Sequence, residues 1–134
     1  MKWKDKISHS MRHRHSRLRL KQKPKHAAMV LRNLATSLLL YESIRTTEKR
    51  AKVVRPVVER LIRIAREKQP REAIRSINRV VTDTNACRKL LEVYRGAADL
   101  GKAGGLTRIT PVGARKGDGA SLVELSLRSP RSPT

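Results

Sequence analysis

Positive charge is the feature of this sequence that most restricts how the chain can fold. The chain has 32 Lys and Arg against 11 Asp and Glu in 134 residues, a formal net charge of +21. Residues 6–41 contain nine of these cations and no acidic residue. A chain this basic repels itself unless a polyanion neutralises it. We therefore expect a nucleic-acid partner and a basic segment that stays disordered without it.

The scarcity of aromatic residues narrows the kind of contact. Apolar residues make up 38% of the chain but aromatic residues only 2%, with no Phe. A modest core can form from Leu, Ile, Val and Ala, but stacking platforms for single-stranded bases are not expected. Arg outnumbers Lys by 20 to 12, which suits phosphate because the planar guanidinium offers two parallel donors. We expect recognition of shape and phosphate.

Length and cysteine content bound the class of protein. The chain is long enough for one domain with tails. Cys87 is its only cysteine, so no disulfide framework or cysteine-based metal site is expected, and a reducing cytoplasm is the expected compartment. Residues 1–10 lack the apolar stretch of a signal peptide, and the longest apolar stretch, residues 34–41, is too short to span a membrane.

The two ends of the chain do not have the pattern of folded elements. Residues 12–25 read RHRHSRLRLKQKPK and show no apolar stripe at helical spacing. We interpret residues 1–25 as an extended basic arm that is ordered by its partner, although a merely solubilising tail is the alternative. Residues 129–134 are rich in Ser and Pro and are expected to be disordered. Residues 26–128 then form a single globular domain.

Apolar spacing predicts four helices. The first covers residues 26–41, and the second runs from an N-cap at Thr47 to about Lys68, with a kink or break expected at Pro56. The third begins at Pro70, and the fourth is capped by Asp83 or Thr84. The predicted inward residues are Ala27, Leu31, Leu34, Leu38 and Tyr41 in the first helix, Ile74, Ile77 and Val81 in the third, and Cys87, Leu90, Leu91 and Tyr94 in the fourth.

Three strands are predicted around these helices. Residues 43–46 favour a brief strand, and residues 122–128 alternate cleanly between apolar and polar positions. Residues 106–112 also read as a strand, in which Pro111 indicates a sheet edge or a bulge. The Gly-Asp-Gly sequence within residues 114–120 is typical of a turn. The predicted fold class is α+β, with about four helices packed on a small mixed sheet of about three strands.

One stretch resembles a known family. Residues 44–62, IRTTEKRAKVVRPVVERLI, have the frame I-x-T-T-x-x-R-A-K, six residues, then E-x-L-I, which resembles the signature of bacterial large-subunit ribosomal protein family seventeen. Residues 11–15 (MRHRH), 31–40 (LRNLATSLLL) and 104–109 (GGLTRI) also resemble that family, in its order. The closing hairpin matches at Arg115, Gly117, Asp118, Glu124 and Leu125. The chain departs from the family at Arg63, where Thr is usual, and at Leu106, where an aromatic is common.

The resemblance implies a structural constituent of the large ribosomal subunit in the cytoplasm. The implied partners are large-subunit ribosomal RNA and neighbouring proteins near the polypeptide exit side, with no cofactor, no membrane and no small-molecule substrate. Family members usually begin near Met11, which implies that residues 1–10 are an extension or that Met11 is the start.

Three groups of residues are the candidates for RNA contact. The arm and the first helix supply Arg12, His13, Arg14, Arg17, Arg19, Lys21, Lys23, Lys25, His26, Arg32 and Asn33. The start of the second helix supplies hydroxyls, free N–H groups and cations at a positive helix end, namely Thr46, Thr47, Lys49, Arg50 and Lys52. Thr47 is equally well explained as a cap alone, and Lys52–Glu48 and Arg63–Glu59 are expected as surface ion pairs. The C-terminal hairpin supplies Arg108, Arg115 and Lys116.

Other functions fit less well. His13 and His15 lack further ligands for a metal, and no paired acid and base indicates an enzyme. A DNA-binding protein is one alternative, because the third and fourth helices could form a helix-turn-helix, although their turn lacks Gly. A protein that only visits the ribosome is another. A membrane-surface binder is a distant fourth possibility, because apolar and basic residues are not segregated in the arm.

Overall fold

The computed structural model describes residue 20, residues 22–95 and residues 106–128. The predicted arm up to residue 19, the Gly-rich segment 96–105 and the tail 129–134 lie outside the described residues. The described elements, in chain order, are α2 (Pro24–Tyr41), β1 (Ser43–Thr47), α3 (Glu48–Glu67), α4 (Pro70–Asn78), α5 (Thr84–Tyr94), β2 (Thr107–Ala114) and β3 (Ser121–Leu127). This confirms the predicted α+β class.

The three described strands form one antiparallel sheet in the order β1-β3-β2. The expectation of a mixed sheet was wrong in this respect. Strands β2 and β3 are joined by a short hairpin, and β1 pairs with the other edge of β3. Both pairings are antiparallel, so no parallel crossover is needed among these strands. The position of Pro111 was predicted correctly, because β2 is an edge strand with a bulge between Pro111 and Gly113.

Helix α2 begins at Pro24, two residues before the predicted start, because proline favours the first helical position, where no hydrogen bond to its nitrogen is needed. Its last turn differs from the prediction: Tyr41 is 72% exposed rather than part of the core. Thr36, which is not among the predicted inward residues of this helix, is buried. Its hydroxyl donates to the carbonyl of Arg32 at 2.8 Å and accepts from the backbone N–H of Thr82 at 3.2 Å, which satisfies it there.

Helix α3 runs unbroken through Pro56. The proline is exposed, so the carbonyl that loses its helical partner lies on the solvent side and the expected break does not occur. Thr47 is the N-cap residue, as predicted, but its side chain makes no capping hydrogen bond. The Lys52–Glu48 ion pair is confirmed at 2.9 Å. The Arg63–Glu59 pair is wrong, since Glu59 instead pairs with Arg55 at 3.4 Å.

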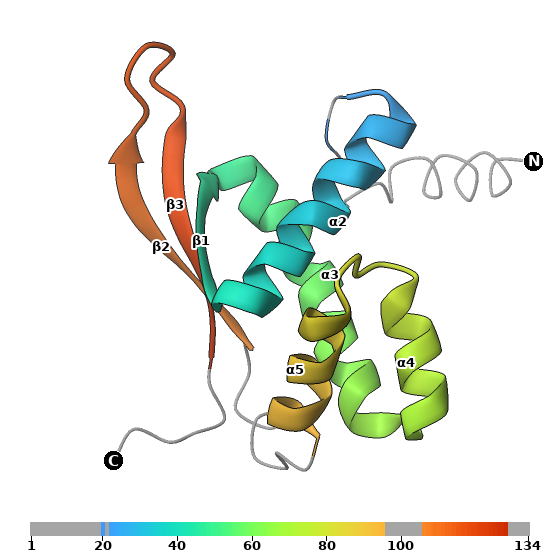
Figure 1. Ribbon diagram of the computed structural model, residues 1–134. Coiled ribbons are helices and arrows are strands. Elements are labelled where there is room, and N and C mark those ends of the chain that lie inside the picture. Colours follow the sequence, from blue (N-terminus) through green and yellow to red (C-terminus); the bar gives the residue numbers. More distant parts are fainter. Residues whose placement is uncertain (1–19, 21, 96–105, 129–134) are drawn as a thin grey trace, which may run out of the picture.

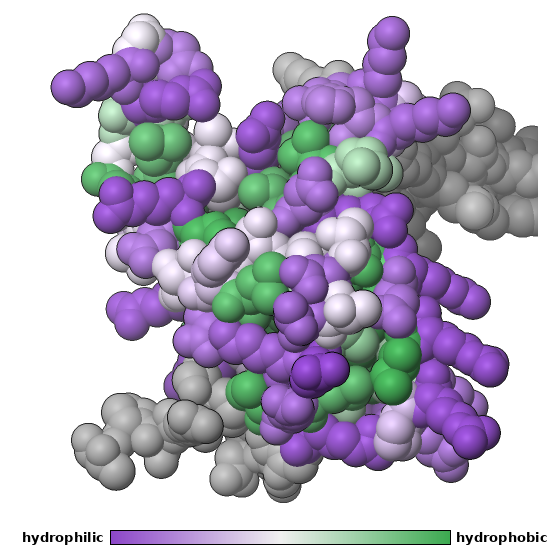
Figure 2. Space-filling view, viewed as in Figure 1, coloured by the Kyte–Doolittle hydropathy of each residue, from purple (hydrophilic) through white to green (hydrophobic). Residues whose placement is uncertain are grey.

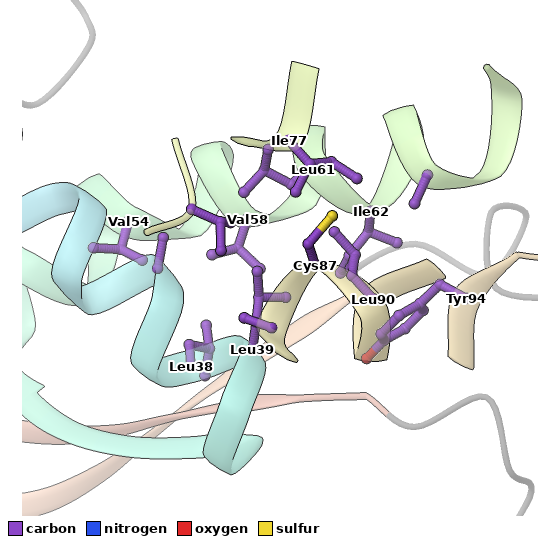
Figure 3. Packing of buried hydrophobic residues seen from close by; sticks show 14 of the residues in the cluster. Leu38, Leu39, Val54, Val58, Leu61, Ile62, Ile77, Cys87, Leu90 and Tyr94 are labelled. Atoms are coloured by element: carbon purple, nitrogen blue, oxygen red, sulfur yellow. The ribbon is translucent and has the colours of Figure 1, made fainter. Parts of the chain in front are cut away.

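The helices enclose the core (Figure 3). It is mainly aliphatic, and its largest fully buried side chains are Leu38, Ile62, Ile77, Leu90, Leu125, Val54 and Val58. Cys87 packs in this cluster as predicted, and burial raises the pKa of its thiol. Asp83 caps α5 by accepting from the N–H of Asn85 at 2.8 Å, also as predicted. In α4 the buried residues are Ala73 and Ile77, whereas Ile74, predicted to face inward, is 40% exposed.

The described helices all lie on one side of the sheet, and none of them covers its other side (Figure 1). Alternation along the strands points Ile44, Val123 and Leu125 toward the helices, where they join or pack against the core. The polar neighbours point the other way and form what we call the open sheet face: Ser43, Arg45, Arg108, Thr110, Glu124 and Ser126. None of the described helices is long and apolar enough to cross a membrane.

Candidate nucleic-acid interface

The folded body carries a large share of the positive charge. The described residues include 22 Lys and Arg but only 9 Asp and Glu. Ion pairs with described carboxylates are made by Lys52, Arg55, Lys89 and Arg115. The charge excess is therefore a property of the body as well as of the predicted arm, and the body alone can attract a polyanion.

The first group of predicted residues lies at the beginning of α2. Lys23, Lys25 and His26 are exposed there, and the first turn of α2 contains no acidic residue. A helix without an acidic residue in its first turn keeps the partial positive charge of its free N–H groups available to an anion. The beginning of α2 thus combines three side chains that can carry positive charge with a positive helix end.

The chain enters α2 across a hollow between α2 and α3. This hollow has a volume of about 430 Å³ and is mainly apolar, lined by Leu20, Gln22, Pro24, Ala27, Ala28, Leu31 and Val53. Leu20 and Gln22 are half-buried, so the segment before α2 is already held against the body. Leu20 and Gln22 therefore lie beside the exposed cations of the first turn of α2.

The residues of the second group, at the start of α3, differ in exposure. Lys49 and Lys52 are exposed, and Arg50 is half-buried. Thr46 is only 8% exposed and points to the helix side of the sheet, so its hydroxyl faces the protein. Because Thr47 forms no capping bond, the first N–H groups of α3 have no side-chain acceptor from it. These groups point in the direction in which an anion would bind.

The third group is the turn of the β2–β3 hairpin. Lys116 is exposed, and Arg115 forms an ion pair with Asp118, with Nε donating to Oδ1 at 3.0 Å. The bonds from Arg115 and from the N–H of Ala120 lower the pKa of Asp118 to about 2. Gly117 and Gly119 have φ values of 103° and 69°, which favour glycine, so the turn depends on these two residues.

The three groups lie at the same end of the molecule. Thr47 and Gly113 both align with Leu122 in the sheet register, which brings the hairpin turn to the same end as the start of α3. The start of α2 lies at that end as well (Figure 1). We call this surface the basic end, formed by Lys23, Lys25, His26, Lys49, Arg50, Lys52, Arg115 and Lys116. In Figure 2 a notch separates the hairpin from the helices at this end.

Other predicted residues lie elsewhere. Arg32 is half-buried, and its Nε donates to the carbonyl of Val80 at 3.1 Å, so it holds α2 to the segment after α4. Asn33 is exposed on α2, and Arg108 lies on the open sheet face. The remaining candidates lie outside the described residues: Arg12, His13, Arg14, Arg17, Arg19 and Lys21.

The structure also exposes cations that were not among the predicted RNA contacts. Arg45 on β1 lies on the open sheet face, and the alternation of residues 43–47 is the signal that could have identified it. Exposed arginines also follow the outer surface of α3 and α4, namely Arg60, Arg63, Arg71 and Arg75. Their positions opposite the buried stripe are visible in helical spacing.

Helix α5 does not resemble a recognition helix. It buries Ala86, Cys87 and Leu90, and the side chains that it exposes include Arg88 together with the acidic Glu92. A helix that enters the major groove presents several base-reading side chains on an exposed surface. This argues against the helix-turn-helix alternative.

Comparisons with known proteins agree with the resemblance noted in the sequence. The family model for ribosomal protein L17 matches residues 30–128. Large ribosomal subunit protein bL17 of Chloroflexus aggregans is 38% identical over 117 residues, which is 87% of this chain and 99% of that protein. The bL17 protein of Gemmatimonas aurantiaca is 41% identical, over 87% of this chain and 98% of its own length. The chain belongs to the ribosomal protein L17 family.

Proposed function

We propose that this chain is a structural constituent of the large ribosomal subunit that binds ribosomal RNA through its N-terminal arm and the basic end of its body. The family is structural and non-enzymatic, and membership supports a place in the large subunit. The observation that carries the RNA-binding part is the position of three separately predicted basic groups at one end of the body, where Leu20 and Gln22 lie next to the start of α2. Such a surface neutralises several phosphates together.

The arm and the basic end have different physical roles in this proposal. The body presents its cations on fixed elements, so it sets position, while the arm follows the RNA backbone into crevices that a globular surface cannot enter. The arm is ordered only on binding, and counterion release offsets that entropy. If about eight to ten phosphates are neutralised in all, the log–log dependence of affinity on salt should have a slope of roughly −6 to −9.

Protein neighbours near the polypeptide exit side, implied by the resemblance, are part of the same proposal. The body has a second, mainly apolar hollow of about 370 Å³ between α4 and α5, where Ile74 and Leu91 are among the lining residues. An apolar hollow offers no favourable contact to phosphate, whereas it can bury an apolar side chain of a neighbouring protein. Cross-linking from Asn78→Cys at its rim in assembled subunits should capture a protein, and capture of RNA alone would contradict this part of the proposal.

Membership in the particle is tested by quantitative mass spectrometry of large subunits that have been washed at high salt and banded on a gradient. We expect one copy per subunit after the wash. Loss from the particle in the wash would instead identify a protein that visits the ribosome. Recovery with the nucleoid would favour the DNA-binding alternative.

The arm is tested by comparing two variants with the unaltered chain. Deletion of residues 1–19 spares Leu20 and Gln22, which line the hollow, so the body should remain folded. Replacement of Arg12, Arg14, Arg17 and Arg19 by Ala keeps the chain length and removes only charge. Both variants should bind large-subunit ribosomal RNA far more weakly and with a shallower salt slope. Normal affinity and assembly of both variants would show that the arm does not contribute.

A further inference from the structure

The open sheet face is polar and holds unpaired cations. The register sets Arg45 opposite Glu124 and Arg108 opposite Ser126, so the two arginines lie on the strands that flank β3. Adjacent strands are about 4.8 Å apart, which separates the two arginine-bearing strands by roughly 10 Å. Both arginines are exposed, and within the described part of the chain neither side chain has a hydrogen-bond or ion-pair partner.

The acidic residue on this surface is occupied by another group. The Ser43 hydroxyl donates to Oε1 of Glu124 at 2.5 Å, although Arg45 lies directly across from Glu124 in the ladder. A guanidinium with no carboxylate partner keeps its donors for a ligand, and its fork geometry matches phosphate. The two strands flanking β3 therefore each present a free phosphate-binding group.

The remaining chemistry of the face favours the backbone of an RNA duplex. The six residues that define it are polar, and the half-buried Leu122 lies on the same side of β3 at the hairpin end, so the face has few of the apolar anchors of a protein interface and no platform for stacked bases. Thr110 and Ser126 add hydroxyl groups between and beside the arginines. An A-form helix has a wide, shallow minor groove that displays phosphates and ribose 2′-hydroxyls, and a broad polar sheet face fits that shape.

We propose that the open sheet face docks on the minor groove of a double-stranded segment of large-subunit ribosomal RNA. Arg45 and Arg108 bind phosphates at two positions on the groove, and the hydroxyls of Thr110 and Ser126 face the riboses between them. This surface is separate from the basic end, so the protein contacts RNA in two directions. The inference rests on the proposed function, because it takes ribosomal RNA as the partner.

The test compares two double variants of the full chain that lose the same charge. Arg45→Ala with Arg108→Ala changes the open sheet face, and Arg71→Ala with Arg75→Ala changes exposed positions on α4. Binding to large-subunit ribosomal RNA is measured across a range of salt concentrations. The sheet variant should bind roughly tenfold more weakly, with a salt slope shallower by about 2, since each lost phosphate contact removes about 1. Equal losses in both variants, or no loss in the sheet variant, would overturn the inference.

A second measurement locates the contact in assembled subunits. Cys87 is buried and is the only native cysteine, so an iron chelate can be attached selectively to Thr110→Cys on the open sheet face. Radicals from this position should cut both strands of one ribosomal RNA helix. If the ribosomal RNA is not cut near this position, the open sheet face does not dock on RNA.

The outcomes for the two proposals can be separated. If the unaltered chain is missing from salt-washed subunits, the proposed function fails and this inference fails with it. If the unaltered chain is present and the sheet variant binds and assembles equally well, only the docking of the sheet face is disproved.

Discussion

The two sides of the sheet differ in burial and polarity although they are built from alternate residues of the same strands. Leu125 is fully buried on the helix side, whereas the preceding residue, Glu124, is half-buried on the open face. Ile44 packs against the core, and Arg45 beside it is exposed. A step of one residue along a strand therefore changes the expected effect of a substitution from loss of folding to loss of binding.

The two sides also treat polar groups differently. On the helix side Thr107 is 5% exposed, and its hydroxyl donates to Oε1 of Glu59 at 3.0 Å. On the open face Arg45 and Arg108 have no such partner within the described residues. A buried polar group must be satisfied by the protein, whereas an exposed one can leave its bonds to water or to a ligand. The open face is thus free to serve binding.

The largest contrast is expected between Leu125→Ala and Ser126→Ala. Leu125 is fully buried, so its truncation should lower the free energy of unfolding by about 2–5 kcal/mol through lost burial and a cavity. Ser126 is the next residue and lies on the open face, where its truncation should cost less than about 0.5 kcal/mol. Urea unfolding of both variants checks this, and similar losses would contradict the division between the two sides.

A smaller contrast is expected between Thr107→Val and Thr110→Val, which remove the same hydroxyl from opposite sides of β2. Thr107→Val removes the donor to Glu59 and should cost about 1 kcal/mol. The loss should not be larger, because Glu59 keeps its bond to Arg55 and some exposure. Thr110→Val should change the free energy of unfolding by less than about 0.5 kcal/mol. Thermal unfolding of both variants checks this. An equally small loss of stability in the two variants would mean that Glu59 does not need this donor.

Arg45→Ala should weaken the binding of ribosomal RNA without destabilising the fold. The side chain is exposed and unpaired in the described part of the chain, so the free energy of unfolding should change by less than about 0.5 kcal/mol. The salt slope for ribosomal RNA should nevertheless become shallower by about 1. Arg88→Ala on α5 is the matched control for charge. A marked fall in the melting temperature of Arg45→Ala would show that this arginine serves the fold.

Local patterns predicted the elements well because their causes are local. The alternation of residues 122–128 identified β3, Asp83 was correctly chosen as a possible cap, and the missing N–H of Pro111 indicated an edge or bulge. Pairing direction and helix ends were predicted less well. The exposure of Tyr41 and the burial of Thr36 depend on which distant segment packs there, and Thr82 is 46 residues away from Thr36.

The candidate site was predicted as separate groups but not as a surface. Sequence spacing selected the starts of α2 and α3 and the hairpin turn. The register of β1 and β2 against β3 brings the start of α3 and the hairpin turn to one end, and the packing of α2 brings its start to the same end. Thr46 was selected for its neighbours in the chain, whereas the pleat turns it inward. Arg45 was missed because β1 is only five residues long, too short for its alternation to be convincing without the sheet.

The smallest effect is expected in the hairpin turn, which joins β2 to β3 at the end of the sheet. The pKa of Asp118 is lowered from 3.8 to about 2, first by its bond from Arg115 and then by the N–H of Ala120. A carboxyl whose pKa is lowered in the folded state stabilises the fold above its unfolded pKa and loses that contribution as pH falls. The turn should therefore loosen between about pH 4 and pH 2 while the core stays folded. An NMR titration of the Asp118 carboxyl carbon follows this directly.

Two variants decide which hydrogen bond controls the titration of Asp118. Arg115→Ala should raise the midpoint of Asp118 toward 3.8, whereas Lys116→Ala, which removes a neighbouring cation that makes no bond to Asp118 in the described structure, should leave it near 2. An unchanged midpoint in Arg115→Ala would assign the low pKa to the backbone of Ala120 instead. In that case Arg115 would be held less firmly by Asp118, and its guanidinium would be available to phosphate without first breaking an ion pair.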